Sequence, residues 1–231
     1  MKKTYIFLFI IFMFIASCGN KITGPSENID GIAYYDPSNA ETKEYNFIRI
    51  DPKGAYIDTR SMFKKLAVSK NAIIYLEEGH NEITKNTIIS FVKKFEEYYP
   101  KEIEIYGSPS DLDQNGKIIF LIGNLNTNQT KEKPGIGGYF YGYDLIYGKD
   151  NVKGEYLHID PSVADENYIL GIMMHELQHL INYYNNAMQG KAMDIWLNEG
   201  LAESTSHIFA KDISDSRLQV LNAIPYYSFY S

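Results

Sequence analysis

Five consecutive residues, His175-Glu176-Leu177-Gln178-His179, have the spacing of an H-E-x-x-H metal-binding motif. On an α-helix the two histidines lie one turn apart, about 40° around the axis and about 6 Å along it, so both rings can converge on one cation. Glu176 then flanks the same site, where its carboxylate can act as a base on a zinc-bound water. The alternative is a chance match, in which both histidines are hydrogen-bonded core residues.

The sequence around the motif predicts a buried helix. From Tyr168 to Tyr184 nearly every residue outside the motif is apolar, with Asn182 as an exception, and a helix that is apolar all round is normally buried. Titratable groups on such a helix cost free energy unless a metal or hydrogen bonds compensate them. We expect Asp165 to cap the helix, with Asn167 as the alternative start.

A catalytic zinc site needs a third protein ligand and an open position for water. The residues after Asp194 predict a second helix that Asp194 can cap, and Glu199 falls in its first turns. With the two histidines, Glu199 gives the two-histidine, one-glutamate ligand set of catalytic zinc. The sequence therefore predicts one Zn²⁺ at this site.

Glu203 lies one helical turn beyond Glu199, on the same face of the predicted helix. We expect its carboxylate to accept a hydrogen bond from the outward ring nitrogen of His175 or His179, as metal-binding histidines usually require. The alternative is that both glutamates belong to a solvated helix face. The apolar pair Trp196-Leu197 argues against this alternative, because it implies burial on one side.

With these motifs the chain resembles the gluzincin metallopeptidases, because HELQH is followed after twenty residues by the glutamate of WLNEGLAE. Upstream segments narrow the resemblance to the hyicolysin family of secreted bacterial zinc peptidases. These segments are 111–117 (DLDQNGK), 137–140 (GGYF) and 155–161 (EYLHIDP). The resemblance extends over roughly residues 111–209.

The resemblance implies that His175, His179 and Glu199 bind zinc and that Glu176 is the catalytic base. It also implies an α+β, zincin-like fold. Such a fold has a twisted mixed sheet, an active-site helix behind the edge strand of that sheet, and here a short, mostly helical C-terminal part. The expected activity is that of a zinc endopeptidase, with a peptide or protein as substrate.

In gluzincins an edge strand over the cleft pairs with the extended substrate through main-chain hydrogen bonds. By this resemblance, Gly138, Tyr139 and Phe140 are the candidate substrate-binding residues, and side pockets would set sequence preference. The alternative is that these residues form an ordinary inner strand. His158, in a later strand pattern, is expected to be structural and not a ligand.

The resemblance weakens after Phe209. Family members continue into a helical lobe that often supplies a histidine or tyrosine for the oxyanion, but His207 lies about 12 Å from Glu199 along the helix, which is too far. Tyr226 and Tyr227 are unsupported candidates, so the chain is expected to be truncated or to have a minimal lobe.

A second hypothesis is a surface lipoprotein that binds proteins through the same groove without catalysis. A third, an aminopeptidase, lacks the upstream Gly-x-Met-Glu-Asn signature.

The first residues predict a bacterial lipoprotein leader, residues 1–17. Lys2 and Lys3 precede an apolar run that is too short to span a membrane comfortably. The sequence Ile15-Ala16-Ser17-Cys18 resembles a lipobox, so we expect cleavage before Cys18, lipid modification of its thiol, and a tether over residues 18–28. The expected location is the cell envelope, facing outside the cytoplasm. The alternative is an ordinary signal peptide that is cut elsewhere.

The net charge of the chain limits the kinds of partner it can bind. The formal charge is −7, and it becomes −9 when the two leader lysines are removed. An acidic chain with no basic cluster argues against nucleic acid. We expect a monomer whose partners are its substrate and, through Cys18, a membrane.

The remaining chain is predicted to form a β-rich lobe over residues 29–162 and a helical zinc-binding part over residues 163–231. Strands are expected at 44–50, 72–76 and 118–122, a short helix at 59–67, and a longer helix at 83–99. Thr84 is available to cap the longer helix and Pro100 to end it.

The loop over residues 111–117 opens like an EF-hand, with Asp111, Asp113 and Asn115 at the first ligand positions. An EF-hand needs a glutamate at the twelfth position, where this chain has Ile122, so the loop is not an EF-hand. Two interpretations stay open: a turn made by Asn115-Gly116, or a Ca²⁺ site that uses Asp111, Asp113 and Asn115.

Overall fold

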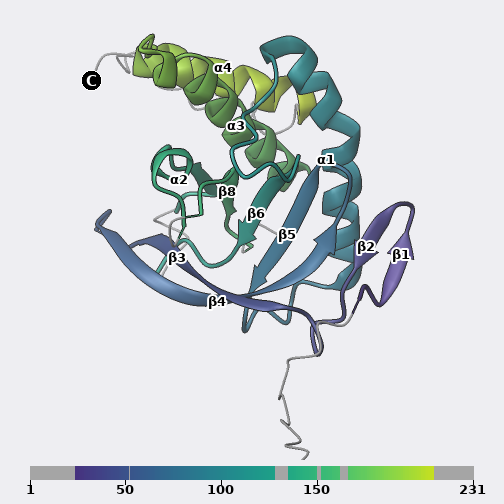
Figure 1. Ribbon diagram of the computed structural model, residues 1–231. Helices are drawn as coiled ribbons and strands as arrows, with labels where there is room; N and C mark the ends of the chain where they lie inside the picture. The colour runs from purple at the N-terminus through teal and green to yellow at the C-terminus, as the bar shows by residue number, and fades with distance from the viewer. Residues whose placement is uncertain (1–23, 52, 128–134, 150–151, 162–165, 211–231) are drawn as a thin grey trace, which may run out of the picture.

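The computed structural model describes residues 24–51, 53–127, 135–149, 152–161 and 166–210. These residues form the mixed α+β architecture that the sequence predicts, with one sheet and helices packed against it (Figure 1). Several sequence predictions lie outside the described residues: the leader, Cys18, the Asp165 cap and the segment 211–231. In the part that the structure describes, no helix is both long enough and apolar enough to cross a bilayer.

The sheet has eight strands, in the spatial order β1-β2-β4-β5-β6-β8-β7 with β3 paired to β4. Their bounds are β1 (Glu27–Ile29), β2 (Ile32–Tyr34), β3 (Thr42–Ile50), β4 (Tyr56–Val68), β5 (Ala72–Glu77), β6 (Ile118–Ile122), β7 (Gly138–Phe140) and β8 (Tyr156–Ile159). The pairs β5–β6 and β6–β8 are parallel, and all other pairs are antiparallel. Within the described ranges β7 pairs with β8 alone, so it forms one edge of the sheet as described.

The helices follow and interrupt these strands. They are α1 (Lys85–Tyr106), α2 (Tyr143–Ile146), α3 (Glu166–Asn185), the 3-10 helix η1 (Ala187–Gln189) and α4 (Ile195–Phe209). Helices α1 and α3 lie against the sheet, and α4 packs on α3 (Figure 1).

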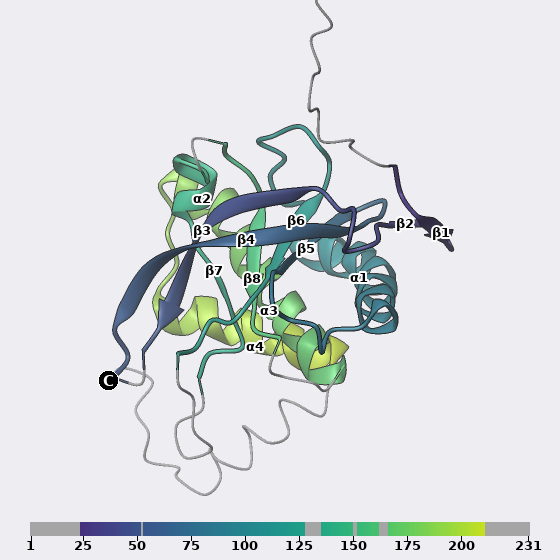
Figure 2. The same ribbon diagram turned by 90° about the horizontal axis from the view of Figure 1, so that it is seen from below.

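Two apolar clusters lie on the two faces of the sheet. The first joins the central strands to α1 and α3, with Phe95, Phe120 and Met173 fully buried in it. The second lies under β3, where Tyr45 and Phe47 pack on residues of β5, β6 and β8, among them Tyr156. Figure 2 shows β3 and β4 crossing in front of these strands, with the helices behind them. The central strands are therefore covered on both faces, and β6 and β8 are buried along their whole length.

The predicted short helix at 59–67 is wrong, because these residues lie within β4. The cause is a register shift between Lys65 and Ala67 in the pairing of β4 with β5. A bulge inserts one extra residue and breaks the two-residue alternation of a strand. Phe63, Leu66 and Ala67 are all buried as a result, in a spacing that resembles a helical face.

Thr84 caps α1 as predicted, because its hydroxyl accepts a hydrogen bond from the Thr87 N–H at 3.2 Å. Pro100 does not end this helix, which continues to Tyr106. A proline in a helix interior loses a hydrogen bond and costs about 3 kcal/mol. The last turns form nevertheless, because Ile103 and Tyr106 pack against the first cluster.

The second face of the sheet also carries a buried ion pair between Arg49 and Glu77, whose side chains are 15% and 10% exposed. His80 Nε2 lies 3.4 Å from Glu77 Oε2, and the Asn124 N–H donates to the same oxygen. Burial alone raises the pKa of Glu77, but the hydrogen bonds from His80, Arg49, Ser61 and Asn124 lower it to about 2.

This depressed pKa predicts acid sensitivity. The ionised Glu77 contributes stability that is complete above its unfolded-state pKa of 4.5 and is lost as the pH falls toward about 2. The loss from this group is at most about 3 kcal/mol in the free energy of unfolding. We expect Glu77→Gln to remove most of this pH dependence in urea denaturation between pH 5 and pH 3. The exposed neighbour Glu78 supplies the control, since Glu78→Gln should keep the wild-type slope; equal slopes in both variants would contradict the assignment.

Candidate active site

Helix α3 brings the two histidines and the glutamate of the H-E-x-x-H motif to one place. The Nε2 atoms of His175 and His179 face each other at 3.1 Å, and their rings are nearly perpendicular. Most of the neighbouring residues on this helix are apolar and buried, including Met173, Met174 and Leu177. The helix therefore fixes both ring nitrogens on a wall that remains partly open, with both histidine side chains just over one-tenth exposed.

Helix α4 adds Glu199 to this pair. Its two carboxylate oxygens lie 3.6 Å from His175 Nε2 and 3.6 Å from His179 Nε2. In a tetrahedral zinc site with bonds of about 2.0–2.1 Å, the ligand atoms are about 3.3 Å apart. The two imidazole nitrogens lie close to this separation, and each lies 3.6 Å from a different oxygen of Glu199, so the three side chains form a group that could hold one metal ion.

Two hydrogen bonds between side chains of α4 and residues of α3 fix the position of α4 along α3. The Ser206 hydroxyl donates to the Gly171 carbonyl at 2.9 Å, and Asn182 Nδ2 donates to Asn198 Oδ1 at 2.5 Å. Asp194 stands at the N-cap position of α4 as predicted, but its side chain makes no capping hydrogen bond. The predicted burial of Trp196 and Leu197 is wrong, since they are 45% and 38% exposed. The first three residues of α4 are therefore exposed, and the contacts with α3 begin at Asn198.

The three groups strongly influence one another's protonation. Hydrogen bonds with His175 and His179 hold the pKa of Glu199 far below its usual range. Burial lowers the pKa of His179, but Glu199, Glu176 and Asn198 together raise it above its ordinary value. Without a metal, the protein thus favours a proton on His179 beside an ionised Glu199. A bound dication would take the place of that proton.

Glu176 is buried beside the histidines, and the Phe140 N–H donates a hydrogen bond to its carboxylate. Burial raises the pKa of Glu176, against the opposing effects of the two histidines and of this N–H. A carboxyl with a raised pKa can both take and release a proton near neutral pH. The geometry therefore suits Glu176 to proton transfer, and not to metal binding.

Glu203 supports one of the two histidines. Its Oε1 lies 3.5 Å from Nδ1 of His175, the ring nitrogen that faces away from Glu199. Of the two alternatives, the structure thus pairs Glu203 with His175 and not with His179. The side chain beside His179 is that of Asn198, which sequence reasoning missed; its position directly before Glu199 was the available signal.

A cleft of ≈ 320 Å³ opens in front of these groups. Its lining combines β7 and the glycines before it with α3 and α4: Gly135, Ile136, Gly137, Gly138, Tyr168, Gly171, Ile172, His175, Glu176, Glu199, Glu203 and Ser206. Among the described strands, the one predicted to bind substrate is therefore an edge strand and not an inner strand, and it borders the same cleft as the candidate metal ligands.

Strand β7 and α3 approach each other as closely as glycine allows. A Cβ atom on Gly138 would lie 2.6 Å from Ile172 Cγ2 and 2.9 Å from the His158 carbonyl oxygen. A Cβ on Gly137 would lie 2.3 Å from Ile172 Cδ1. This close packing is what lets the Phe140 N–H reach Glu176.

Tyr139 anchors β7 from the other face of the sheet. Its ring stacks on His158 at 4.1 Å between centroids, and its hydroxyl accepts a hydrogen bond from the Ile48 N–H at 3.0 Å. Its side chain therefore has a structural role, and its main chain lies opposite His158 in the pairing of β7 with β8. His158, fully buried under this ring, occupies a structural position as predicted.

The predicted calcium residues are only partly brought together. One carboxylate oxygen each of Asp111 and Asp113 lies close to one of Glu155, a residue that sequence reasoning did not consider for this site. Asn115 closes the loop instead, because its Oδ1 accepts the Lys117 N–H at 2.6 Å and its Nδ2 donates to Asp113 Oδ2. The turn at Asn115-Gly116 is present, with Gly116 at a φ of 67°.

The chain is similar in sequence to a metalloprotease, which agrees with a cleft that contains candidate metal ligands. The chain is 26% identical over 166 residues to the neutral metalloprotease ShpI of Staphylococcus hyicus. The matched region covers 66% of this chain and 37% of that relative. The chain thus spans well under half the length of the relative it matches. No protein-family model matches the sequence. The similarity supports a metallopeptidase family and a metal-dependent protease at the general level.

The close packing at Gly138 yields a steric prediction. We expect Gly138→Ala to force β7 away from α3, since neither Ile172 nor the His158 carbonyl can move freely, and to lower proteolytic activity at least about tenfold while the metal stays bound. Gly200→Ala is the matched control, because a Cβ there meets nothing within 4 Å. Equal activity of both variants on a fluorogenic peptide would contradict this account.

The contact between Glu203 and His175 yields a prediction about metal affinity. Replacing the partner of a metal-binding histidine typically weakens binding by about 10–100-fold, because the ring loses its orientation and basicity. We expect a loss of this size for Glu203→Ala and a smaller one for Glu203→Gln, which keeps an acceptor oxygen. Competition with a chromophoric zinc chelator measures both. Wild-type affinity in Glu203→Ala would show that the contact is incidental.

Proposed function

We propose that this protein is a zinc-dependent endopeptidase that hydrolyses peptide bonds of extracellular or envelope proteins. The observation that carries the proposal is that one cleft joins three groups with zinc-site spacing, a buried carboxylate beside them, and a free strand edge. His175, His179 and Glu199 would hold the Zn²⁺. Similarity to a neutral metalloprotease supports the general activity.

Glu176 would serve as the general base and then as the general acid. When bound at this site, zinc supplies a lowered pKa for its water and polarisation of the scissile carbonyl. The Glu176 carboxylate, held in place by the Phe140 N–H, takes the proton of the attacking water and passes it to the nitrogen of the departing amine. Glu203 keeps the His175 ring oriented through its Nδ1.

The edge strand β7 would align the substrate. An extended peptide can add to a free strand edge through main-chain hydrogen bonds, which bind many sequences equally, while side pockets set preference. Gly138 lets β7 lie close to α3 beside the cleft, and the Tyr139 hydroxyl, which accepts the Ile48 N–H, holds the strand from the opposite face of the sheet. A polypeptide chain that continues past both ends of the cleft is compatible with this arrangement, which favours internal cleavage.

We further propose that lipid modification of Cys18 holds the protein, as a monomer, at the outer side of a bacterial membrane. The lipobox-like sequence supports this part of the proposal, and Cys18 itself lies outside the described residues. A membrane anchor would confine cleavage to proteins of the envelope and its surroundings. The acidic chain makes nucleic acid an unsuitable partner.

The decisive experiment compares the wild type with Glu176→Gln and Glu199→Ala. We expect Glu176→Gln to keep one zinc per chain but to lose about 10²–10⁴-fold of the activity, because only the proton-transfer group is removed. Glu199→Ala should lose zinc and activity together, because one ligand is gone. Elemental analysis gives the zinc content, and cleavage of a broad peptide library gives the activity.

The outcomes separate the main alternatives. Zinc in the wild type without cleavage would favour a protein that binds partners through the same groove. Release of single residues from peptide amino termini would point to an aminopeptidase. Absence of zinc after metal-replete preparation would overturn the proposal.

A further inference from the structure

A second group of acidic side chains lies at the amino-terminal ends of the parallel strands β6 and β8. Asp111 and Asp113 come from the loop between α1 and β6, and Glu155 directly precedes β8. One carboxylate oxygen of each of the three residues lies within 4.8 Å of those of the other two. These residues take no part in the proposed zinc site.

Glu155 is the unusual member of this group. Its side chain is fully buried, its Oε1 accepts the Leu112 N–H at 3.0 Å, and its Oε2 has no hydrogen-bond partner among the described residues. The buried Ser110 hydroxyl lies beside the Glu155 carboxyl and lowers its pKa, but its geometry does not complete a hydrogen bond to Oε2. Buried polar atoms without partners are rare in native proteins and point to a missing ion or water.

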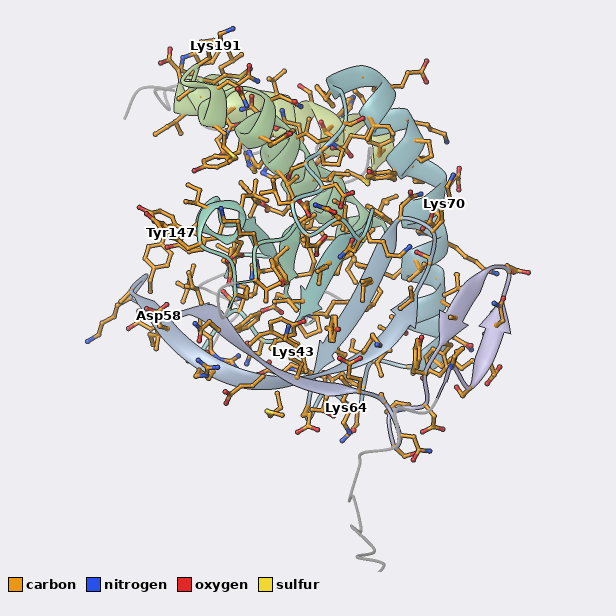
Figure 3. The ribbon with its side chains drawn as sticks, in the orientation of Figure 1. Lys43, Asp58, Lys64, Lys70, Tyr147 and Lys191 are labelled. Carbon is orange, nitrogen blue, oxygen red and sulfur yellow. The ribbon has the colours of Figure 1, made fainter. Side chains whose placement is uncertain are left out.

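The negative charge of this group is not balanced by side chains in the described residues. No lysine, arginine or histidine there forms an ion pair with Asp111, Asp113 or Glu155. The nearby Lys117 ammonium donates to the carbonyl oxygens of Ser69 and Lys70 instead. Figure 3 shows Lys70 at the turn between β4 and β5, next to α1. Burial raises the pKa values of Asp113 and Glu155, and the neighbouring carboxylates of the group raise them further, against the lowering effect of hydrogen bonds from Asn115 to Asp113 and from Ser110 and Leu112 to Glu155.

Gly154 leaves the space beside Asp113 open. A Cβ atom at this position would lie 3.2 Å from Asp113 Oδ2 and 3.0 Å from the Tyr156 ring. A side chain there would crowd the carboxylate against the fixed end of β8. The glycine therefore lets the segment that leads into β8 pass close to the Asp113 carboxylate.

We propose that Asp111, Asp113 and Glu155 bind a calcium ion. Three clustered carboxylates without imidazole or thiolate ligands suit a hard cation, and calcium accepts six to eight oxygen ligands in irregular arrangements, with water and carbonyl oxygens completing the shell. Mg²⁺ fits less well, because it demands near-ideal octahedral geometry and keeps most of its waters. Asp111 and Asp113 supply the opening ligands of an EF-hand-like loop.

The glutamate that an EF-hand loop carries at its twelfth position is supplied here by a different strand. Parallel pairing places Tyr156 opposite Ile119, and the Ile119 N–H donates to the Glu155 carbonyl at 2.8 Å. The pairing of β6 with β8 thus brings Glu155 next to the loop 111–117, although the two are far apart in the sequence. A bound ion would tie the loop before β6 to the start of β8 and so stabilise the centre of the sheet.

Thermal unfolding of the full-length protein tests this proposal, with zinc held constant and calcium removed by a chelating resin before titration. We expect a free Ca²⁺ concentration of about a hundred times the dissociation constant of the site to raise the unfolding temperature of the wild type by about 5–10 °C. The same concentration of MgCl₂ should raise it much less. Glu155→Gln should lose this shift, since it removes the charge but keeps an acceptor for the Leu112 N–H. Glu104→Gln, an exposed carboxylate on α1, should respond like the wild type.

Isothermal titration with CaCl₂ on Asp111→Asn provides a second measurement if Glu155→Gln does not fold. Loss of calcium binding in either variant, with zinc content unchanged, supports the site independently of any peptidase activity. A wild type without a calcium shift, an equal response to magnesium, or a calcium response retained in Glu155→Gln and Asp111→Asn would each overturn the assignment.

Discussion

Helix α3 carries three titratable groups into a largely apolar interior, which costs free energy. Groups on the neighbouring elements α4 and β7 offset this cost. His175 and His179 face a carboxylate from α4, and Glu176 receives an N–H from β7. Isolated, each of these groups would be costly to bury, but together they provide one another with opposite charges and hydrogen bonds. The same requirement explains why α4 is held to α3 by hydroxyl and amide side chains.

The sheet contributes by bringing distant segments together. The parallel strands β5, β6 and β8 form its centre, covered by helices on one face and by β3 on the other. Because β8 pairs with β7 at one edge and with β6 at the other, it connects the strand edge of the cleft with the acidic group beside Glu155. A single short strand therefore positions parts of two separate sites.

Sequence reasoning succeeded where the information is local. The Thr84 cap depends on residues within one helical turn, and the structure confirms it. The H-E-x-x-H spacing is equally local, and the structure brings its two histidines together with Glu199 of α4. Sequence reasoning failed where a distant contact overrides the local pattern. The bulge at Lys65 gives β4 a helix-like distribution of apolar residues, and packing of Ile103 on the core carries α1 past Pro100. Glu155 could not be assigned to the acidic loop, because only strand pairing brings it there.

The contact between Gly138 and α3 also bears on how such a site can change during evolution. With Ile172 and the His158 carbonyl already at the limit of approach, the β7 wall offers almost no neutral substitutions. The opposite wall, on α4, presents Glu199 and Glu203 with about half and a third of their side chains exposed, and so has more freedom around them. Substitutions that change the lining of the cleft are therefore accommodated more easily on α4 than beside Gly138 on β7.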